Sequence, residues 1–391
     1  MTIIKEDYLD LAPHGQSLSD VVVLAQAWKK SHEFIRRHNW YADMLELDSS
    51  IVDLEDSLSR WASDVSKEGF QPEDLLLVPA PKNAKWEFMP AKSATSWEDF
   101  LELEIDEWGS EPKFGDWTPK KKKKGKVDDA TGFDTSSQKL RPLAHLSIRD
   151  QTLATAVMIC LAEAVETVQG DTAGKDILAS RNQGVVSYGN RLHCSWIDRA
   201  SFPARAKFSW GNSRTYRQYF QDYRSFLARP RIVCAERAPQ LATQRELFVV
   251  SLDIKSFFDK VDCKALLREL KRIEGEYHQS FGLPDRLAAD PEFWQRAERI
   301  CTWQWRAADH EHAALIHGDD VSDLGLGLPQ GLIAAGFFAN AYVVRFDEQL
   351  RQIVEEGWDI GKDVKIVDYC RYVDDMRLVV EAKSGGGGFG Q

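Results

Sequence analysis

The stretch IVDYCRYVDDMRLVVEA, residues 366–382, carries the clearest structural pattern in this sequence. β-branched and aromatic residues flank the adjacent Asp374 and Asp375, and this pattern predicts two strands joined by a tight turn. Upstream, the run ELFVVSLDI (residues 246–254) predicts a buried strand that ends near Asp253. A carboxylate at the end of a buried strand is costly unless a partner or a cation neutralises it. The sequence therefore predicts an antiparallel sheet with acidic residues gathered at one end.

The composition indicates a large folded protein. A chain of 391 residues exceeds one typical domain, and its 43% hydrophobic content is sufficient for an extensive core. No apolar run approaches the roughly 20 residues of a spanning helix, and the acidic start MTIIKEDYLDL lacks the layout of a signal peptide. The six cysteines form no CxxC pair, which favours reduced thiols. We expect a cytoplasmic protein without a membrane segment.

Charge divides the chain into three regions, although the total is −11. Residues 1–110 carry a net −12 and read as mainly helical, residues 111–240 carry +9, and residues 241–391 carry −8. Binding of a polyanion depends on the local field and not on the total. The three regions are therefore predicted domains, and the middle one is the candidate nucleic-acid surface.

Two basic features lie in that middle region. A lysine run that includes Lys120, Lys121 and Lys122 reads either as a solvated loop or as an arm that contacts phosphates. The stretch RTYRQYFQDYRSFL (residues 214–227) predicts a helix with an aromatic core stripe. Arg217 and Arg224 lie seven residues apart on another face of that helix, where guanidinium groups suit phosphate contacts.

The aspartates suggest a metal site. Adjacent carboxylates repel each other, and a bound cation relieves that repulsion. Carboxylate oxygens with few histidines suit Mg²⁺ or Mn²⁺. Two such ions, about 4 Å apart, activate an attacking hydroxyl and stabilise a departing phosphate group.

Several segments occur in an order that resembles the reverse transcriptases, especially the prokaryotic enzymes related to group II introns and retrons. SLDIKSFFDKVD (251–262), GLGLPQGLIAAGFFANAY (325–342) and RYVDDMRL (371–378) resemble the palm. KLRPLAHLSIRDQTLATAV (139–157) resembles the fingers, and SYGNRL (187–192) resembles a further family segment. The resemblance implies an α+β right-hand polymerase: fingers, an antiparallel palm sheet with the YVDD hairpin, and a helical N-terminal region.

The resemblance also implies roles for particular residues. Asp253, Asp374 and Asp375 would be the catalytic ligands of two Mg²⁺ or Mn²⁺ ions, helped by the carbonyl of Ile254. Phe258 would be the aromatic gate that collides with a ribose 2′-hydroxyl. Its alternative, shared with Phe257, is packing in the core, and we expect one of the two rings to pack inward.

Further positions would contact the incoming nucleotide. Gln330 and Gly331 match the loop next to the nucleotide and template, and Arg141 and Arg149 match the fingers positions that grip a triphosphate. For Arg149, an ion pair with the adjacent Asp150 is the alternative.

Some features depart from the family pattern. Ala335 stands where intron-type enzymes usually have a serine, and the segment between Asp253 and Gln330 is longer than the compact family core. The later palm elements and the thumb are not recognisable after the hairpin, so we expect that a longer chain or a partner supplies the primer grip.

The leading hypothesis is an RNA-directed DNA polymerase that uses dNTPs, an RNA template and a DNA product, with a role in bacterial antiviral defence of the abortive-infection kind. Template-independent or protein-primed synthesis by the same fold is one alternative. A non-catalytic RNA-binding scaffold is another. A structured non-coding RNA, a protein partner that supplies the thumb, and an oligomer are all compatible with these residues.

Overall fold

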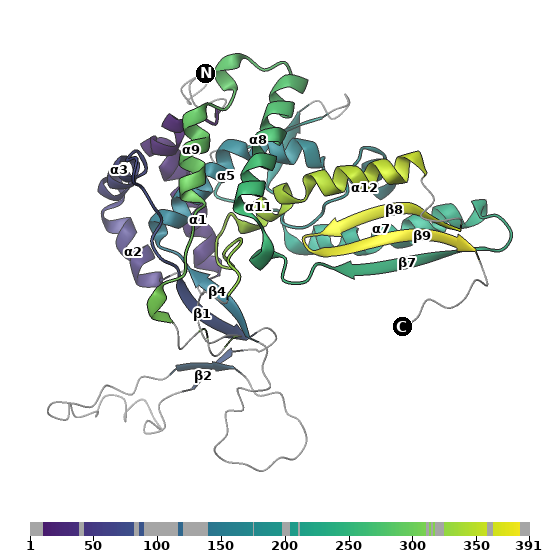
Figure 1. Cartoon of the computed structure of the whole chain (residues 1–391), viewed down its shortest axis with the longest axis horizontal. Coiled ribbons are helices and arrows are strands. Elements are labelled where there is room, and N and C mark those ends of the chain that lie inside the picture. The colour runs from purple at the N-terminus through teal and green to yellow at the C-terminus, as the bar shows by residue number, and fades with distance from the viewer. Residues whose placement is uncertain are drawn as a thin grey trace, which may run out of the picture.

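The computed structural model describes residues 11–38, 43–81, 86–89, 116–119, 140–174, 176–197, 204–209, 212–309, 313, 316, 324–357 and 363–383. It shows a helical body beside an elongated lobe that carries the largest sheet of the described chain (Figure 1). The lysine run with Lys120, Lys121 and Lys122 lies outside the described residues.

The helical body is built around α5 (Ile148–Gln169), which is buried over most of its length. A helix that is apolar on all sides belongs in a core, and Ser147 caps it by accepting a hydrogen bond from the Asp150 amide. By length and composition α5 also qualifies as a membrane span, but 83% of that window is buried inside the protein, as in a core helix. Around it pack α1 (Val21–Arg37), α2 (Met44–Val52), α8 (Cys263–Ser280) and α9 (Pro291–Ile300); α3 (Leu54–Val65) packs on α1.

Short antiparallel strand pairs extend the body. β1 (Leu76–Pro81) pairs with β4 (Leu140–His145), β2 (Trp86–Met89) with β3 (Asp116–Pro119), and β5 (Cys194–Ile197) with β6 (Arg205–Phe208). The β1–β4 pair is attached to the rest of the molecule on both sides. Leu75 bridges to Trp305, and the Ala144 amide donates to the Gln330 carbonyl over 2.8 Å.

The lobe is formed by a three-stranded antiparallel sheet in the order β7–β9–β8. Its strands are β7 (Arg245–Asp253), β8 (Val364–Tyr372) and β9 (Asp375–Lys383). The remaining helices are α6 (Ile177–Asn182), α7 (Tyr219–Arg237), α11 (Ala335–Tyr342) and α12 (Val344–Glu356). Hydrophobic residues of α12 pack with Met376, Leu378 and Val380 on one face of β9. On the opposite face, Arg377 lies over the Phe226 ring of α7.

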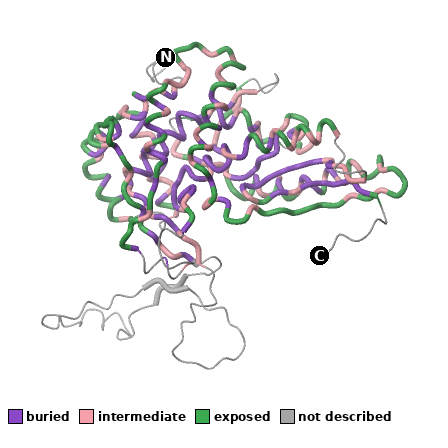
Figure 2. The backbone as a smooth tube through the Cα atoms, viewed as in Figure 1, coloured by how far each residue is buried: buried purple, intermediate pink, exposed green. Residues whose placement is uncertain are grey.

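The expectation that Asp253 ends a buried strand is wrong. β7 is the edge strand, and Phe248, Val249, Val250 and Leu252 are each between 38% and 46% exposed. Figure 2 shows the contrast along the lobe, with β7 exposed and β8 and β9 largely buried. A continuous apolar run is typical of a strand buried on both faces, but α7 and α12 cover the sheet over β8 and β9 and leave β7 exposed.

The predicted helix over residues 214–227 is too long at its start, because α7 begins at Tyr219. Residues 215–217 are held instead by the SYGNRL segment and by His193, which follows it. The His193 amide donates to the Thr215 carbonyl, and the Arg217 amide donates to the Arg191 carbonyl over 2.8 Å. Arg217 and Arg224 therefore do not share a helix. The aromatic stripe is only partly core: Phe226 is buried, while Tyr219 and Phe220 are exposed.

Candidate active site

The sheet brings the predicted aspartates to one end of the lobe. Asp253 is the last residue of β7, Asp375 is the first of β9, and the two are direct cross-strand partners. Val373 and Asp374 connect β8 to β9 as a two-residue turn. The Ile254 amide donates to the Asp374 carbonyl over 3.3 Å, which ties the end of β7 to that turn.

The turn has an unusual backbone. Val373 has a φ of 57°, and of the two turn residues only Val373 has a positive φ. Hairpin turns with a positive φ at the first central residue ordinarily have glycine there, and a β-branched residue in this region is strained. Such strain persists only where the surroundings fix the backbone. Gly189 helps to hold the Val373 backbone, because it packs so closely that an added Cβ would lie 2.6 Å from a Val373 methyl group.

The carboxylates fit a hard divalent cation. Asp253 and Asp375 are exposed and directly opposed, and no described residue pairs with either carboxylate. Like charges opposite each other in a sheet are destabilising, and a cation between them would remove that cost. Within the described residues no cluster of three or more His, Cys, Asp or Glu side chains is already gathered around a metal position. The fit therefore rests on the opposed pair and the neighbouring Asp374.

A cleft of about 840 Å³ opens beside this end of the sheet. Its walls come from β4, α1, the segment 213–219 and the loop before α11, so distant parts of the chain meet there. Predicted residues on its wall are Arg141, Arg217, Phe258, Gln330 and Gly331; Tyr372, from the YVDD segment, and Ala335 also line it.

The two phenylalanines after β7 have separate environments. Phe257 is buried and packs in the main core, whereas Phe258 is half-buried and lines the cleft. Their rings meet edge to face with centroids 5.6 Å apart. The expectation that one of them packs inward is confirmed, and Phe258 is the ring available to a ligand in the cleft.

The Gln330–Gly331 loop is fixed by contacts on two sides. The Gln330 side-chain amide donates to Asp259 over 3.1 Å, and the Gly331 carbonyl accepts from Gln151 over 2.7 Å. Gly331 has a φ of 143°, and a Cβ there would lie 2.0 Å from the Ala144 carbonyl oxygen. Only glycine fits this backbone and this approach.

The predicted basic residues do not act alike. Arg141 is half-buried on β4 and lines the cleft. The Arg149 guanidinium instead forms an ion pair with Asp150 over 2.9 Å and lies over the Phe70 ring, which is the alternative that the sequence left open. Arg217 pairs with Asp222 over 3.1 Å at the cleft wall. Arg224 is exposed on α7, over the Phe220 ring.

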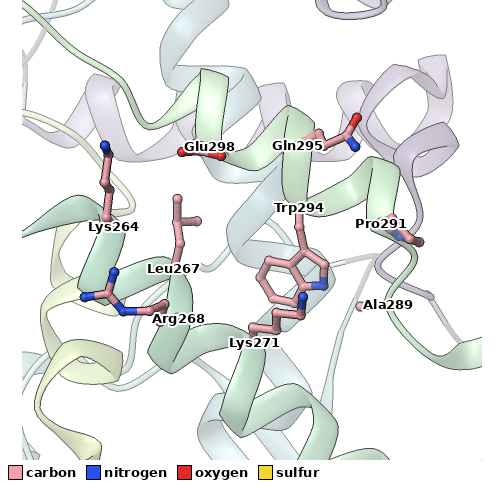
Figure 3. Close-up of a pocket in the computed structure, with 9 residues that line it drawn as sticks. All are labelled: Lys264, Leu267, Arg268, Lys271, Ala289, Pro291, Trp294, Gln295 and Glu298. Carbon is pink, nitrogen blue, oxygen red and sulfur yellow. The ribbon is translucent and has the colours of Figure 1, made fainter.

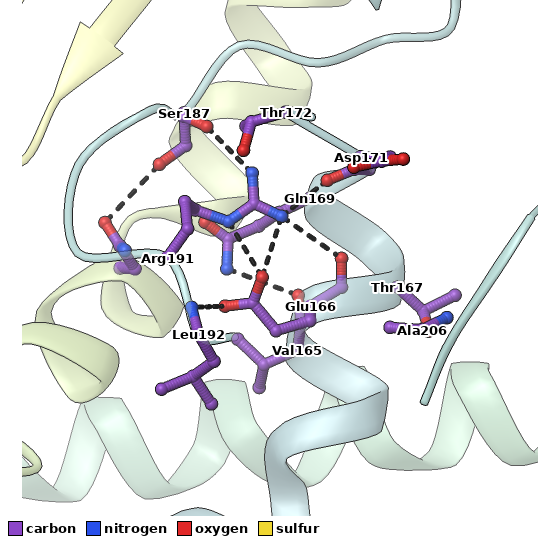
Figure 4. A network of polar contacts seen from close by, with 12 residues as sticks. Val165, Glu166, Thr167, Gln169, Asp171, Thr172, Ser187, Arg191, Leu192 and Ala206 are labelled. Carbon is purple, nitrogen blue, oxygen red and sulfur yellow. Dashed lines mark hydrogen bonds and ion pairs between the residues drawn. The ribbon is translucent and has the colours of Figure 1, made fainter. Parts of the chain in front are cut away.

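A buried ion pair holds the SYGNRL segment in place (Figure 4). Arg191 donates to the Glu166 carboxylate of α5 over 2.9 Å and to the Ser187 carbonyl over 2.9 Å. The same carboxylate accepts from the Leu192 amide. Both side chains are almost fully buried, so this pair anchors the segment to the core helix. Sequence reasoning gave this segment a family resemblance but no role.

Sequence reasoning also missed residues that support the aspartate turn. Tyr219, Tyr223 and Phe226 of α7 surround the Tyr372 ring, with centroids between 5.1 and 5.8 Å away. Burial, followed by the nearby acidic groups, raises the pKa of the Tyr372 hydroxyl, so it stays protonated. Arg371 and Asn340 are fully buried behind the turn. The aromatic spacing of residues 216–226 was the available signal, but it does not show which ring meets the hairpin.

A second cavity lies between α8 and α9, with a volume of about 510 Å³ (Figure 3). Lys264, Arg268 and Lys271 come from α8, and Trp294 and Glu298 from α9. These residues are not among those that line the cleft beside the aspartates.

The fold and the site together define a class. An antiparallel sheet with opposed aspartates at one end, next to a cleft with an aromatic ring and cationic side chains, is suited to nucleotidyl transfer. The family model for reverse transcriptase (RNA-dependent DNA polymerase) matches residues 214–386. The chain thus carries a reverse transcriptase domain and is an RNA-directed DNA polymerase, a nucleotidyltransferase. No curated protein matches the chain.

The match begins just before α7 and includes the sheet and the elements between its strands. It confirms the expectation of a reverse transcriptase, and such a domain implies an RNA template, a DNA product and dNTPs. Reverse transcriptase domains generally use divalent metal ions, typically Mg²⁺.

Proposed function

We propose that the aspartate end of the sheet performs two-metal nucleotidyl transfer. Asp253, Asp374 and Asp375 would hold the ions with their carboxylates, and Ile254 would contribute its carbonyl. Two divalent cations there supply activation of the primer hydroxyl and stabilisation of the departing pyrophosphate. The observation that carries the proposal is the cross-strand register of Asp253 and Asp375, two exposed carboxylates without a described partner.

The cleft residues would orient the incoming nucleotide. Gln330 and Gly331, fixed against β4, would contact the nucleotide and template from one side, and Arg141 would neutralise triphosphate charge. Phe258 would occupy the space that a ribose 2′-hydroxyl needs. The ring excludes that hydroxyl only by its bulk. Removal of the ring should therefore change the preference for dNTPs over rNTPs more than the rate of dNTP incorporation.

Nucleotide incorporation tests the proposal. Wild-type protein and the Asp374→Asn variant would be compared with Mg²⁺ and with Mn²⁺, on RNA, on DNA and without a template. We expect templated dNTP incorporation by the wild type only. Equal incorporation by Asp374→Asn would rule out the metal assignment. Wild-type synthesis that is equally efficient without a template would favour the template-independent or protein-primed alternative.

Phe258→Ala tests the gate separately. We expect the preference for dNTPs over rNTPs to fall roughly 10- to 100-fold, the usual size of a steric discrimination, while dNTP incorporation is retained. Phe257→Ala is the matched control, because that ring packs in the core and should affect stability instead. Unchanged discrimination in Phe258→Ala would exclude a gate at this position.

We further propose, from the sequence resemblance alone, that the enzyme acts in the cytoplasm of a bacterium in antiviral defence, with a partner or a further segment that holds the primer. Phage plating on cells that express wild-type protein or Asp374→Asn tests this role. Protection that depends on Asp374 would support it, and equal plaque numbers would count against it.

A further inference from the structure

The turn that carries Asp374 is supported from behind by a buried hydrogen-bond network. Arg371 is fully buried and binds Asp347 of α12 through three hydrogen bonds of 2.6, 3.1 and 3.2 Å. One guanidinium nitrogen also donates to the Val373 carbonyl over 3.0 Å and to the Asn340 side-chain oxygen over 2.9 Å. A single side chain thus connects α12, α11 and the strained residue next to Asp374.

Asn340 extends this network to the SYGNRL segment. Its side-chain nitrogen donates to the Gly189 carbonyl over 2.6 Å and to the Asn190 carbonyl over 3.2 Å. Gly189 in turn packs against Val373 without room for a side chain. The Asn340 oxygen accepts from Arg371 and, over 3.4 Å, from the Ser187 hydroxyl, whereas its nitrogen donates to the two carbonyls of the loop that presses on the turn.

This arrangement does more than neutralise a buried charge. The Arg371–Asp347 pair alone would satisfy the arginine charge, and buried pairs often add little net stability. The additional bonds from Arg371 and Asn340 act on the Val373 carbonyl and on the loop behind it. A β-branched residue keeps a backbone conformation with positive φ only where several contacts hold it there.

We propose that Arg371 and Asn340 are positioning residues that set the direction of the Asp374 carboxylate by holding the Val373 backbone in its strained conformation. The inference rests on the proposed two-metal function. Loosening the network would let Val373 relax, and the metal-binding carboxylates would lose their preorganisation. The effect should appear in metal affinity and in kcat, whereas the dNTP KM should change little.

Two conservative variants separate the contributions. Arg371→Lys keeps the buried charge but loses the planar fork. Asn340→Asp keeps an oxygen that accepts from Arg371 but loses the donors to Gly189 and Asn190. Arg229→Lys is the matched control, because Arg229 forms an equally buried pair with Asp368 of β8. Its other hydrogen bonds among the described residues go to the Val185 carbonyl and the Tyr188 hydroxyl, and not to Val373 or Asp374.

The readouts are Mn²⁺ binding, measured by the electron paramagnetic resonance signal of free Mn²⁺, and steady-state kinetics at varied Mg²⁺ and dNTP. We expect Arg371→Lys and Asn340→Asp to raise the Mn²⁺ dissociation constant and the Mg²⁺ midpoint at least fivefold, and to lower kcat at least tenfold. The dNTP KM should stay within twofold. Arg229→Lys should lower thermal stability to a similar extent without shifting the metal midpoints.

Metal midpoints that do not move in the Arg371 and Asn340 variants, or that move equally in Arg229→Lys, would overturn the inference. Failure of the proposed function has a different signature, in which Asp374→Asn itself binds Mn²⁺ and incorporates dNTPs like the wild type. If Asp374→Asn is inactive while Arg371→Lys binds Mn²⁺ like the wild type, the positioning role alone is rejected and the proposed function stands.

A different observation carries a second inference, in the cavity between α8 and α9. Lys264, Arg268 and Lys271 are exposed on one side of α8, and no described residue forms an ion pair or hydrogen bond with them. Figure 3 shows Lys271 beside the half-buried Trp294 indole, with Lys264 and Arg268 further along the same helix. An adjoining cavity of about 390 Å³ shares Lys264 and continues the groove.

We infer that this groove binds a single-stranded segment of RNA away from the polymerase site. Three unpaired cations in a row complement successive phosphates, and an aromatic face allows a base to stack. Two acidic side chains also line the groove, Glu298 on the opposite wall of this cavity and Asp262 in the adjoining one. Their charges would keep the contact weaker than that of an all-basic groove.

A fluorescein-labelled, unstructured RNA 12-mer tests the inference with the whole chain. The triple variant K264Q/R268Q/K271Q should lower affinity at least tenfold at 100 mM salt. Its slope of log affinity against log salt should fall by about two, since each neutralised phosphate on a single strand contributes about 0.7. The variant R231Q/R286Q/R345Q removes the same charge at scattered exposed positions and should change the slope far less.

Trp294→Ala should weaken binding several-fold, and Trp294→Phe should restore most of it, because the ring is what stacks. A 4-thiouridine probe should crosslink to α9. Equal slopes for the two triple variants, or crosslinks confined to the cleft beside the aspartates, would overturn the inference. Equal loss of affinity for a DNA duplex would replace it with a nonspecific phosphate surface.

Discussion

Strands β8 and β9 differ from β7 in how they are held, although both parts of the sheet supply aspartates. β8 and β9 are covered by α7 and α12 and carry buried ion pairs, such as Arg229 with Asp368 over 2.8 Å. β7 is an edge strand with exposed apolar residues on both faces, joined to the sheet through its ladder with β9. The Asp374 turn is thus fixed from behind, whereas Asp253 lies on a strand with few supports. The candidate site therefore combines one half that is packed between helices with another half that lies on an exposed edge strand.

The largest expected effect is on catalysis. Asp374→Asn and Asp253→Asn should each lower incorporation at least roughly a thousandfold, because metal stabilisation of the transition state is worth several kcal/mol. The loss of activity in Asp253→Asn should not be accompanied by a loss of stability. Asp253→Asn removes one of two opposed charges and should leave the free energy of unfolding unchanged or raised by up to about 1 kcal/mol. Urea unfolding checks this, and a clear destabilisation by Asp253→Asn would show that β7 is braced like its neighbours.

The next effect is on stability. Arg229→Met leaves Asp368 with only Arg181, which lies 3.0 Å away and is partly exposed. Breaking a buried pair typically costs about 3 kcal/mol or more, so the free energy of unfolding should fall by about that amount. Thermal and urea unfolding measure it. A loss below about 1 kcal/mol would mean that β8 is not held by this pair.

A cross-strand pair of valines compares the two strands directly. Val249 of β7 and Val379 of β9 are register partners, but Val249 is 45% exposed and Val379 only 1%. Val379→Thr buries a hydroxyl and should cost about 1–3 kcal/mol. Val249→Thr should stay within about 0.5 kcal/mol. Equal losses, measured by urea unfolding, would indicate that another molecule or segment covers β7.

The smallest effect is a pH dependence at the far end of the sheet. Burial would raise the pKa of Glu381, but hydrogen bonds and charges from Arg237 and Arg245 outweigh it and lower that pKa from its ordinary 4.5. The folded state therefore binds the proton more weakly than the unfolded chain, so this stabilisation is complete above pH 4.5 and is lost as the pH falls through the lowered pKa. The stability difference between wild type and Glu381→Gln should shrink below pH 4.5. A difference that stays constant in acid would contradict this account.

The sequence predicted the parts of the site that depend on local pattern. The strand arms around Asp374 and Asp375 and the existence of a strand that ends at Asp253 follow from apolar spacing. These features are encoded within a few residues of where they act. Spacing did not show which of Phe257 and Phe258 packs inward, or that the backbone at Gly331 requires glycine.

The rest depends on contacts between distant segments. The exposure of β7 depends on which helices cover the sheet, and an apolar run does not record this. Arg149 meets Asp150 and Glu73 because residues 71–73 pass over the start of α5. The network joins residues from three separate segments, Gly189, Asn340 and Arg371. Their spacing in the sequence therefore does not predict that they come into contact.

The contact between β4 and the Gln330–Gly331 loop has a mechanical consequence. The Ala144 amide bonds to the Gln330 carbonyl, and Gly331 lies so close to the Ala144 carbonyl that no side chain fits between them. Any displacement of the paired strands β1 and β4 would therefore displace this loop, and with it the wall of the cleft that Arg141, Gln330 and Gly331 line.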